Sequence, residues 1–145
     1  MGNTQAIYQE ANRRLHRLLG VYLALWGWKH RVDCIVVSGD ELMSFLDLEV
    51  VQSKRISQLA YDLAEFFPEV RPLPSTSAGL KGMLFSRNLN HARWSSRLEV
   101  DEVVAFLNQA GCTASKAVLP SEQEMLSMLS LLIHGVGNFD QPESL

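Results

Sequence analysis

Residues 53–67 constrain the fold most, because their pattern fits one kind of secondary structure. Ser53 can accept a hydrogen bond from a free backbone N–H, and the apolar residues that follow recur at steps of three and four. They are Ile56, Leu59, Ala60, Leu63, Phe66 and Phe67. Pro68 ends the pattern, because its ring cannot continue the helical hydrogen-bond ladder. We therefore predict an amphipathic helix, whose apolar face has to be covered by other elements of the chain.

Three more helices are predicted. Residues 3–27 carry apolar side chains on one face and arginines on the other. Ser96 and Ser121 each stand three residues before a glutamate, which is a capping box and marks the start of a helix. Gly111 and Gly135 are suited to end these two helices, because glycine accepts the backbone conformation found just past a helix. The last third of the chain is therefore expected to be helical.

Two pairs of strands are expected between the helices. Residues 32–37 are apolar and β-branched, residues 38–41 have the composition of a turn, and residues 42–50 end in alternating apolar and acidic side chains. This order predicts a β-hairpin with one face buried and one face in water. Residues 70–73 and 80–85 predict a second pair of short strands, separated by a loop rich in proline, serine and threonine.

The predicted order is α-β-β-α-β-β-α-α, which defines the fold class as α+β. Short antiparallel hairpins with helices packed on one face are the simplest way to bury such a set of elements. A chain of 145 residues, 47% hydrophobic and 20% charged, suits one globular domain. We assign residues 1–137 to that domain and residues 138–145 to a flexible C-terminal tail.

The sequence has none of the features of an exported or membrane protein. Its start lacks a basic segment followed by an apolar stretch, and its most apolar run, residues 18–28, is shorter than the roughly 20 residues of a bilayer span. Cys34 and Cys112 are expected to be reduced, buried thiols. A cytoplasmic location without membrane attachment follows as an expectation.

No metal site is expected among the histidines, because none shares a helix or strand with another histidine or a cysteine at ligand spacing. The four are His16, His30, His91 and His134. His30 and Cys34 lie four residues apart, but a predicted helix end separates them. We expect neither a metal ion nor a cofactor.

Catalytic motifs are also missing from the sequence. There is no Gly-x-Ser-x-Gly elbow to expose a serine, and residues 79–82 lack the spacing of a phosphate-binding loop. A group of acidic residues surrounds the predicted hairpin, where carboxylates are ordinarily solvated rather than catalytic. These residues are Asp40, Glu41, Asp47 and Glu49. We therefore predict that the protein is not an enzyme.

Charge is distributed unevenly, and its polarity is more informative than the net value of −3. Residues 1–35 hold five Lys and Arg against two acids, and residues 36–98 hold seven of each. Residues 99–145 hold one lysine against seven acids. The chain thus runs from basic to acidic, which favours interaction with a charged partner or between its own parts.

Residues 70–98 contain cationic and aromatic side chains and no acid. Arginine forks suit phosphate oxygens and aromatic rings stack on bases, so the segment predicts a nucleic-acid or anion site. Its candidate residues are Arg71, Lys81, Arg87, His91, Arg93, Trp94 and Arg97. The alternative is a basic surface that pairs with the acidic C-terminal helices or that binds an acidic protein partner.

The last predicted helix has more apolar residues than one face can hold, which indicates burial on more than one side. Its candidate interface residues are Met125, Met128, Leu129 and Leu132. One interpretation is a central core helix. The other is docking against a second subunit, where adaptable methionine side chains are common, and this predicts a homo-oligomer.

The region 32–71 resembles the α domain of FtsK/SpoIIIE-type DNA translocases. The matching positions are Ser53, Arg55, Ile56, Leu59, Ala60, Asp62, Leu63 and Ala64, followed by Val70, Arg71, Pro72 and Pro74. The ATP-binding motor of that family has no counterpart here. The resemblance therefore implies an accessory or adaptor domain, associated with nucleic acid or a DNA-translocating machine. The alternative function is a small protein-interaction module, such as a mobile-element adaptor, a chaperone or an immunity-type protein.

Overall fold

The computed structural model describes residues 2–74, 79–87 and 98–137, with side chains between residues 9 and 131 except that of Pro74. The elements are α1 (Gly2–His30), β1 (Cys34–Ser38), α2 (Gly39–Leu46), α3 (Ser53–Asp62), β2 (Glu69–Pro74), β3 (Leu80–Ser86), α4 (Val100–Gln109), β4 (Ala114–Lys116) and α5 (Glu122–Gly137). The predicted α+β class is confirmed, since helices accompany a four-stranded sheet. Residues 138–145, the predicted tail, lie outside the described ranges.

The strands form one mixed sheet in the order β2-β3-β1-β4. β3 is antiparallel to both β2 and β1, whereas β4 runs parallel to β1. The second predicted strand pair is confirmed as β2 and β3. β4 was not predicted, and Asn108 of α4 holds it in place. The Asn108 amide donates to the Ala114 carbonyl over 3.0 Å and accepts from the Ala114 N–H over 2.9 Å.

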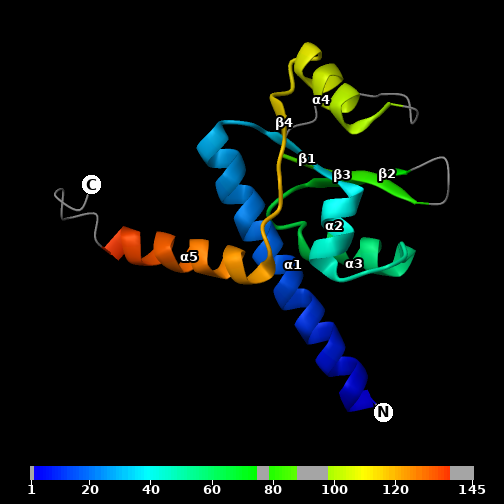
Figure 1. Cartoon of the computed structure of the whole chain (residues 1–145), viewed down its shortest axis with the longest axis vertical. Helices are drawn as coiled ribbons and strands as arrows, with labels where there is room; N and C mark the ends of the chain where they lie inside the picture. The colour runs from blue at the N-terminus through cyan, green and yellow to red at the C-terminus, as the bar shows by residue number, and fades with distance from the viewer. Residues whose placement is uncertain (1, 75–78, 88–97, 138–145) are drawn as a thin grey trace.

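Helices cover both faces of the sheet, so the prediction that they pack on one face is wrong (Figure 1). On one face Ile35, Val37 and Phe85 pack with residues of α1, α2, α3 and α5, and we call this the α1-side core. On the other face Val36 and Leu84 pack with α4, and we call this the α4-side core. β1 is buried on both sides because its residues are apolar without alternation, as in a central strand.

The prediction of a strand over residues 42–50 is wrong, because α2 occupies most of this stretch. Ser38 caps the helix, since its Oγ accepts a hydrogen bond from the Glu41 N–H over 3.3 Å. Leu42 and Leu46 then lie one helical turn apart, and both are buried in the α1-side core. Acidic residues in the first turn interact favourably with the helix dipole. The serine and acids that indicated a turn therefore begin a helix.

Two of the other helix starts were predicted and one begins later than expected. α3 begins at Ser53, but the prediction that Ser53 caps it is wrong, because Gln52 is the N-cap residue and makes no side-chain cap hydrogen bond. Ser121 is confirmed as a cap, since its Oγ accepts from the Glu124 N–H over 3.1 Å. α4 begins after Glu99, which forms a capping box of its own with Glu102. Ser96 lies outside the described residues. In the part of the chain that the structure describes, no helix combines the length and apolarity needed to cross a membrane.

Candidate functional site

One polar cluster is buried inside the helical layer. His16 of α1 is fully buried, and its Nδ1 lies 2.8 Å from Asp62 Oδ2. Arg55 Nε donates to His16 Nε2 over 2.9 Å. Burial lowers the pKa of His16, and Arg55 adds to this, although the hydrogen bond to Asp62 opposes it. The ring is therefore neutral, with its proton on the Nδ1 that faces Asp62.

The His16 cluster joins two helices and does not present a reacting group. A histidine paired with aspartate resembles a general base, but such a base needs a lone pair that faces substrate. Here the Nε2 lone pair accepts from Arg55, and the ring is closed off from solvent. Since Arg55 and Asp62 both belong to α3, the cluster fixes α3 against α1. Among the described residues, no three His, Cys, Asp or Glu side chains are grouped closely enough to hold a metal ion.

The acids near the expected hairpin have structural contacts of their own. Glu41 Oε2 accepts from Ser38 Oγ over 3.1 Å, and its Oε1 accepts from the Leu119 N–H over 3.3 Å. Asp47 ends α2 in a left-handed conformation, while Asp40 and Glu49 are exposed. Glu41 thus ties α2 to the segment before α5.

Two cations of the 70–98 segment already have partners within the chain. Arg71 of β2 is exposed, and its Nε donates to Glu69 Oε2 over 3.0 Å. Lys81 of β3 is mostly buried, and its Nζ donates to the Leu98 carbonyl over 2.9 Å. The same Nζ lies 3.6 Å from Glu99 Oε1, next to the start of α4.

Arg87 lies on the opposite face of the sheet from Arg71. Arg71 pairs with Leu84, whose side chain belongs to the α4-side core. Arg87 instead reaches α1, where its Nη2 donates to the Ala24 carbonyl over 3.3 Å. Its guanidinium also lies 5.7 Å from the centre of the Phe67 ring. The fold therefore does not bring these two arginines into one patch. The other predicted contacts, His91, Arg93, Trp94 and Arg97, lie outside the described residues.

α5 projects from the body of the molecule, and only its beginning lies beside α1 (Figure 1). Met125 is fully buried in the α1-side core and Leu129 is partly buried, whereas Met128 is 49% exposed. Leu126 and Leu131 are 52% and 72% exposed. The Leu132 side chain lies outside the described residues. Of the predicted interface, Met125 is thus a core residue and Met128 is open to solvent.

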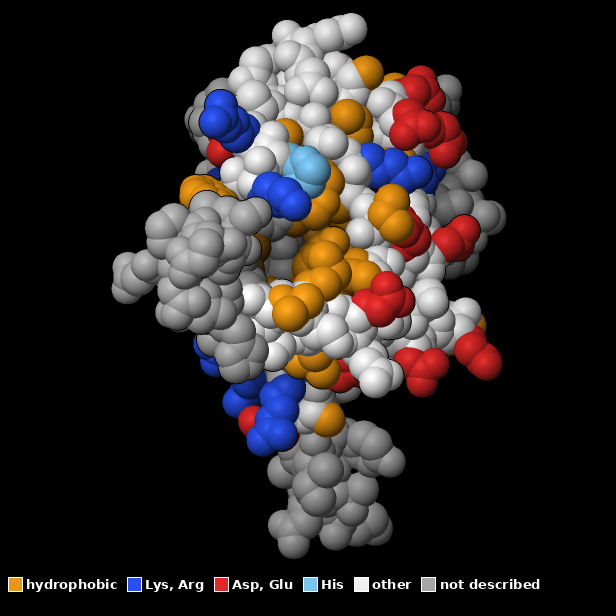
Figure 2. Space-filling model, turned by 60° about the vertical axis from the view of Figure 1, so that its left-hand side comes forward, with side chains coloured by type: hydrophobic (Ala, Val, Ile, Leu, Met, Phe, Trp, Pro, Cys, Tyr) orange, Lys and Arg blue, Asp and Glu red, His pale blue; other side chains and the backbone are white. Residues whose placement is uncertain are grey.

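An apolar surface accompanies this open helix. Figure 2 brings the side of the molecule that carries α5 forward and shows hydrophobic side chains exposed in a hollow. Most acidic side chains in this view lie to the right of the hollow, and basic side chains lie on both sides of it. Val118, just before α5, is 67% exposed. The hollow therefore combines apolar area with charge of both signs.

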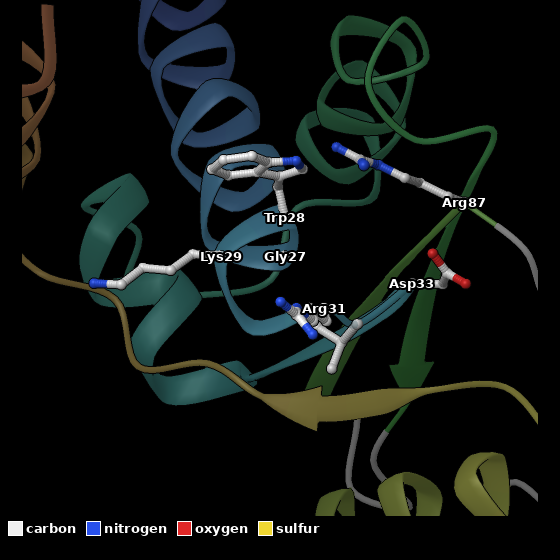
Figure 3. Close-up of a pocket in the computed structure, with 7 residues that line it drawn as sticks. Gly27, Trp28, Lys29, Arg31, Asp33 and Arg87 are labelled. Carbon is white, nitrogen blue, oxygen red and sulfur yellow. The ribbon is translucent and has the colours of Figure 1, made fainter. Parts of the chain in front are cut away.

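A cavity of about 610 Å³ opens where α1 ends (Figure 3). Its lining comes from the end of α1, the segment that leads into β1 and the end of β3. The lining residues are Gly27, Trp28, Lys29, Arg31, Val32, Asp33 and Arg87. Of these, only Arg87 was singled out from the sequence. The mixture of tryptophan and cations over residues 28–31 is the sequence signal that could have indicated this site.

Comparison with family models, curated proteins and solved structures found no match to this chain. The fold and site define an α+β domain with a three-layer arrangement, a projecting helix and a basic cavity. The resemblance to the α domain of FtsK/SpoIIIE-type translocases stays a prediction. In the structure its motif residues Arg55 and Asp62 face α1, where both bind His16.

Proposed function

We propose that the chain is a non-enzymatic, cytoplasmic protein-interaction module that self-associates through α5. The observation that carries this proposal is the exposure of Leu126, Met128 and Leu131 on a helix in which, among the described side chains, Met125 alone is fully buried. Complete burial of such a side chain contributes about 1.5–3 kcal/mol relative to leaving it in water. Several on one helix therefore favour a partner that covers them.

A second copy of the chain is the partner that the charges favour. The acidic residues Glu122 and Glu124 lie in the first turn of α5. The exposed Arg13 and Arg14 lie on α1, the helix that α5 touches. Because every copy carries both signs, two copies related by a twofold axis can place acids of one against arginines of the other. Such pairing would guide two apolar surfaces into register.

Light scattering after size-exclusion chromatography tests self-association. The wild-type chain is expected to have a mass of about twice 16.3 kDa, falling toward one chain on dilution. Met128→Glu and Leu131→Glu should each give a monomer, because they place a charge in the buried interface. Ser57→Glu is the matched control, since Ser57 is exposed on α3 and not on α5, and it should leave the dimer intact. A wild-type chain that is monomeric at every concentration would refute the proposal.

Association with nucleic acid through the 70–98 segment is a second proposal, and the position of Arg71 supports it. Arg71 lies on the edge strand β2, and its exposed ion pair with Glu69 is of a kind that contributes little to stability. A phosphate could therefore replace the Glu69 carboxylate at small cost. The resemblance to the translocases would then make the chain an accessory to a DNA-translocating machine.

Duplex DNA binding measured by fluorescence anisotropy over a range of salt concentrations tests this second proposal. Affinity should fall steeply as salt rises, because phosphate contacts release counterions. Arg71→Gln should lower the slope of log affinity against log salt by about one. Arg14→Gln, which removes an exposed arginine of α1, is the control and should leave the slope unchanged. Binding that is absent at low salt, or that ignores salt, would contradict the proposal.

A further inference from the structure

The end of α1 has a backbone conformation that is unusual for arginine. Arg31 has φ of 57°, in the left-handed region, and its N–H donates to the Trp28 carbonyl over 3.3 Å. The Val32 N–H then donates to the Gly27 carbonyl over 3.0 Å, which closes the helix. Glycine is the residue that usually occupies this position, because it has no Cβ to strain. An arginine held in this conformation points to a use for its side chain.

That side chain belongs to the cavity of about 610 Å³ described above. Figure 3 shows the guanidinium of Arg31 on the α1 side of the cavity and that of Arg87 reaching toward α1 from the end of β3. Lys29 extends away from both, so it contributes at the rim. Asp33 is the single acid among the described residues of the lining. The cavity thus has more positive than negative charge, with two forked donors inside it.

Arg87 is held before any ligand arrives. Its Nη2 bond to the Ala24 carbonyl and its position over the Phe67 ring fix the guanidinium plane. The backbone N–H of Arg87 also donates to the Asp33 carbonyl over 2.9 Å, which ties the end of β3 to the start of β1. A donor oriented in advance loses less conformational entropy when it binds an anion.

Trp28 supplies an aromatic surface at the same cavity. Its side chain is 75% exposed, although an indole is large and mostly apolar. An exposed aromatic ring beside arginines is the combination that binds nucleotides, since the ring stacks on a base while the cations contact phosphate. The carboxylate of Asp33 is a suitable acceptor for ribose hydroxyls. Volumes of about 300–1,000 Å³ are usual for small-molecule sites.

We infer that this cavity binds a nucleotide, with the base against Trp28 and the phosphate between Arg31 and Arg87. The ligand is either a free mononucleotide or one nucleotide unit of a single strand, because the two present the same groups. The site is independent of the α5 surface. It shares only Arg87 with the nucleic-acid proposal above.

The test measures AMP, inorganic phosphate and a short oligoriboadenylate by isothermal titration calorimetry at low salt. AMP or the oligonucleotide should bind, and phosphate alone should bind far more weakly, because it cannot stack on Trp28. Tighter binding of AMP identifies a free nucleotide as the ligand, and tighter binding of the oligonucleotide identifies a strand. Failure of both to bind would overturn the inference.

Two variants connect binding to the cavity. Trp28→Ala should weaken binding roughly ten-fold, from the loss of one stacked base. Tyr61→Ala is its control, since Tyr61 is a 78% exposed aromatic residue of α3 outside the cavity, and it should bind as the wild type. Arg31→Gly should weaken binding while raising the melting temperature, because glycine relieves the left-handed strain. Unchanged affinity in both cavity variants would overturn the inference.

The monomeric Met128→Glu variant separates this site from the α5 surface. It should bind the nucleotide with wild-type affinity, because Met128 belongs to another part of the molecule and is absent from the cavity lining. Loss of binding in this variant would contradict a site contained within one chain.

Discussion

His16 places a neutral ring between two opposite charges. Arg55 donates to one ring nitrogen and Asp62 accepts from the other, so the ring satisfies both neighbours in one tautomer. A buried charge without a partner is costly, and either charge alone beside the ring would lack this compensation. Among the described residues, every buried side-chain nitrogen or oxygen has a hydrogen-bond partner. The cluster therefore fixes how α3 sits on α1 with little loss from burying polar groups.

This cluster predicts a pH dependence of folding stability. Burial lowers the pKa of His16 below its ordinary value of 6.5, so the unfolded chain takes up the proton more readily than the folded chain. The contribution of the neutral His16 to the free energy of unfolding is therefore present above pH 6.5 and is lost as pH falls below that value. Urea unfolding at about pH 7.5 and about pH 5.5 should show this loss in the wild type.

His16→Asn separates this effect from other titrating groups. Asparagine keeps an N–H for Asp62 but cannot take up a proton, so stability should change less between the two pH values. His30→Asn is the matched control, because His30 lies exposed on the same helix, and it should keep the wild-type dependence. An equal pH dependence in His16→Asn and in the wild type would contradict a neutral buried histidine.

The elements differ in how far local sequence determined them. α3 was predictable from the periodicity of its apolar residues, although it ends at Asp62 and not at the predicted residue 67. The start of α5 was predictable because Ser121 caps it. β2 and β3 were predictable, because two short apolar runs flank a loop rich in proline, serine and threonine. α2 was not, because serine and acids in the segment 38–41 suit a turn and a helix cap equally well.

Tertiary contacts decide the case of α2. A Cβ atom on Gly39 would lie 1.8 Å from the Leu80 carbonyl oxygen, so the chain can pass β3 only with glycine at this position. The chain then turns into the helix that buries Leu42 and Leu46. A pattern that reads only neighbours along the chain has no access to such a contact.

The candidate sites depend on the same kind of long-range placement. Trp28 and Arg31 belong to the end of α1, whereas Arg87 comes from the end of β3. The antiparallel pairing of Cys34 with Ser86 brings the two ends together. Strand register over so many residues cannot be inferred from composition, so the cavity could not be predicted. Whether α5 is buried or exposed could not be predicted for a similar reason, since its apolar pattern suited both a core helix and an interface.

At the scale of the whole molecule, β1 and β3 connect two cores that lie on opposite faces of the sheet. Val36 and Leu84 belong to the α4-side core, while Ile35 and Phe85 belong to the α1-side core. Adjacent residues of one strand therefore pack into different cores. Loss of packing in either core should destabilise β1 and β3, which also carry residues of the other core. The described layers are therefore expected to unfold together.

Leu107→Ala tests this expectation, because Leu107 is fully buried in the α4-side core. It should lower the free energy of unfolding by about 2–5 kcal/mol. Trp26 and Trp28 lie on α1, across the sheet, so a Trp94→Phe background makes tryptophan fluorescence report on the distant layer. In urea, fluorescence and far-ultraviolet circular dichroism should shift together to the same lower midpoint. A fluorescence midpoint that stays at the value of the Trp94→Phe parent while the dichroism midpoint falls would divide the chain into two folding units and contradict a single domain.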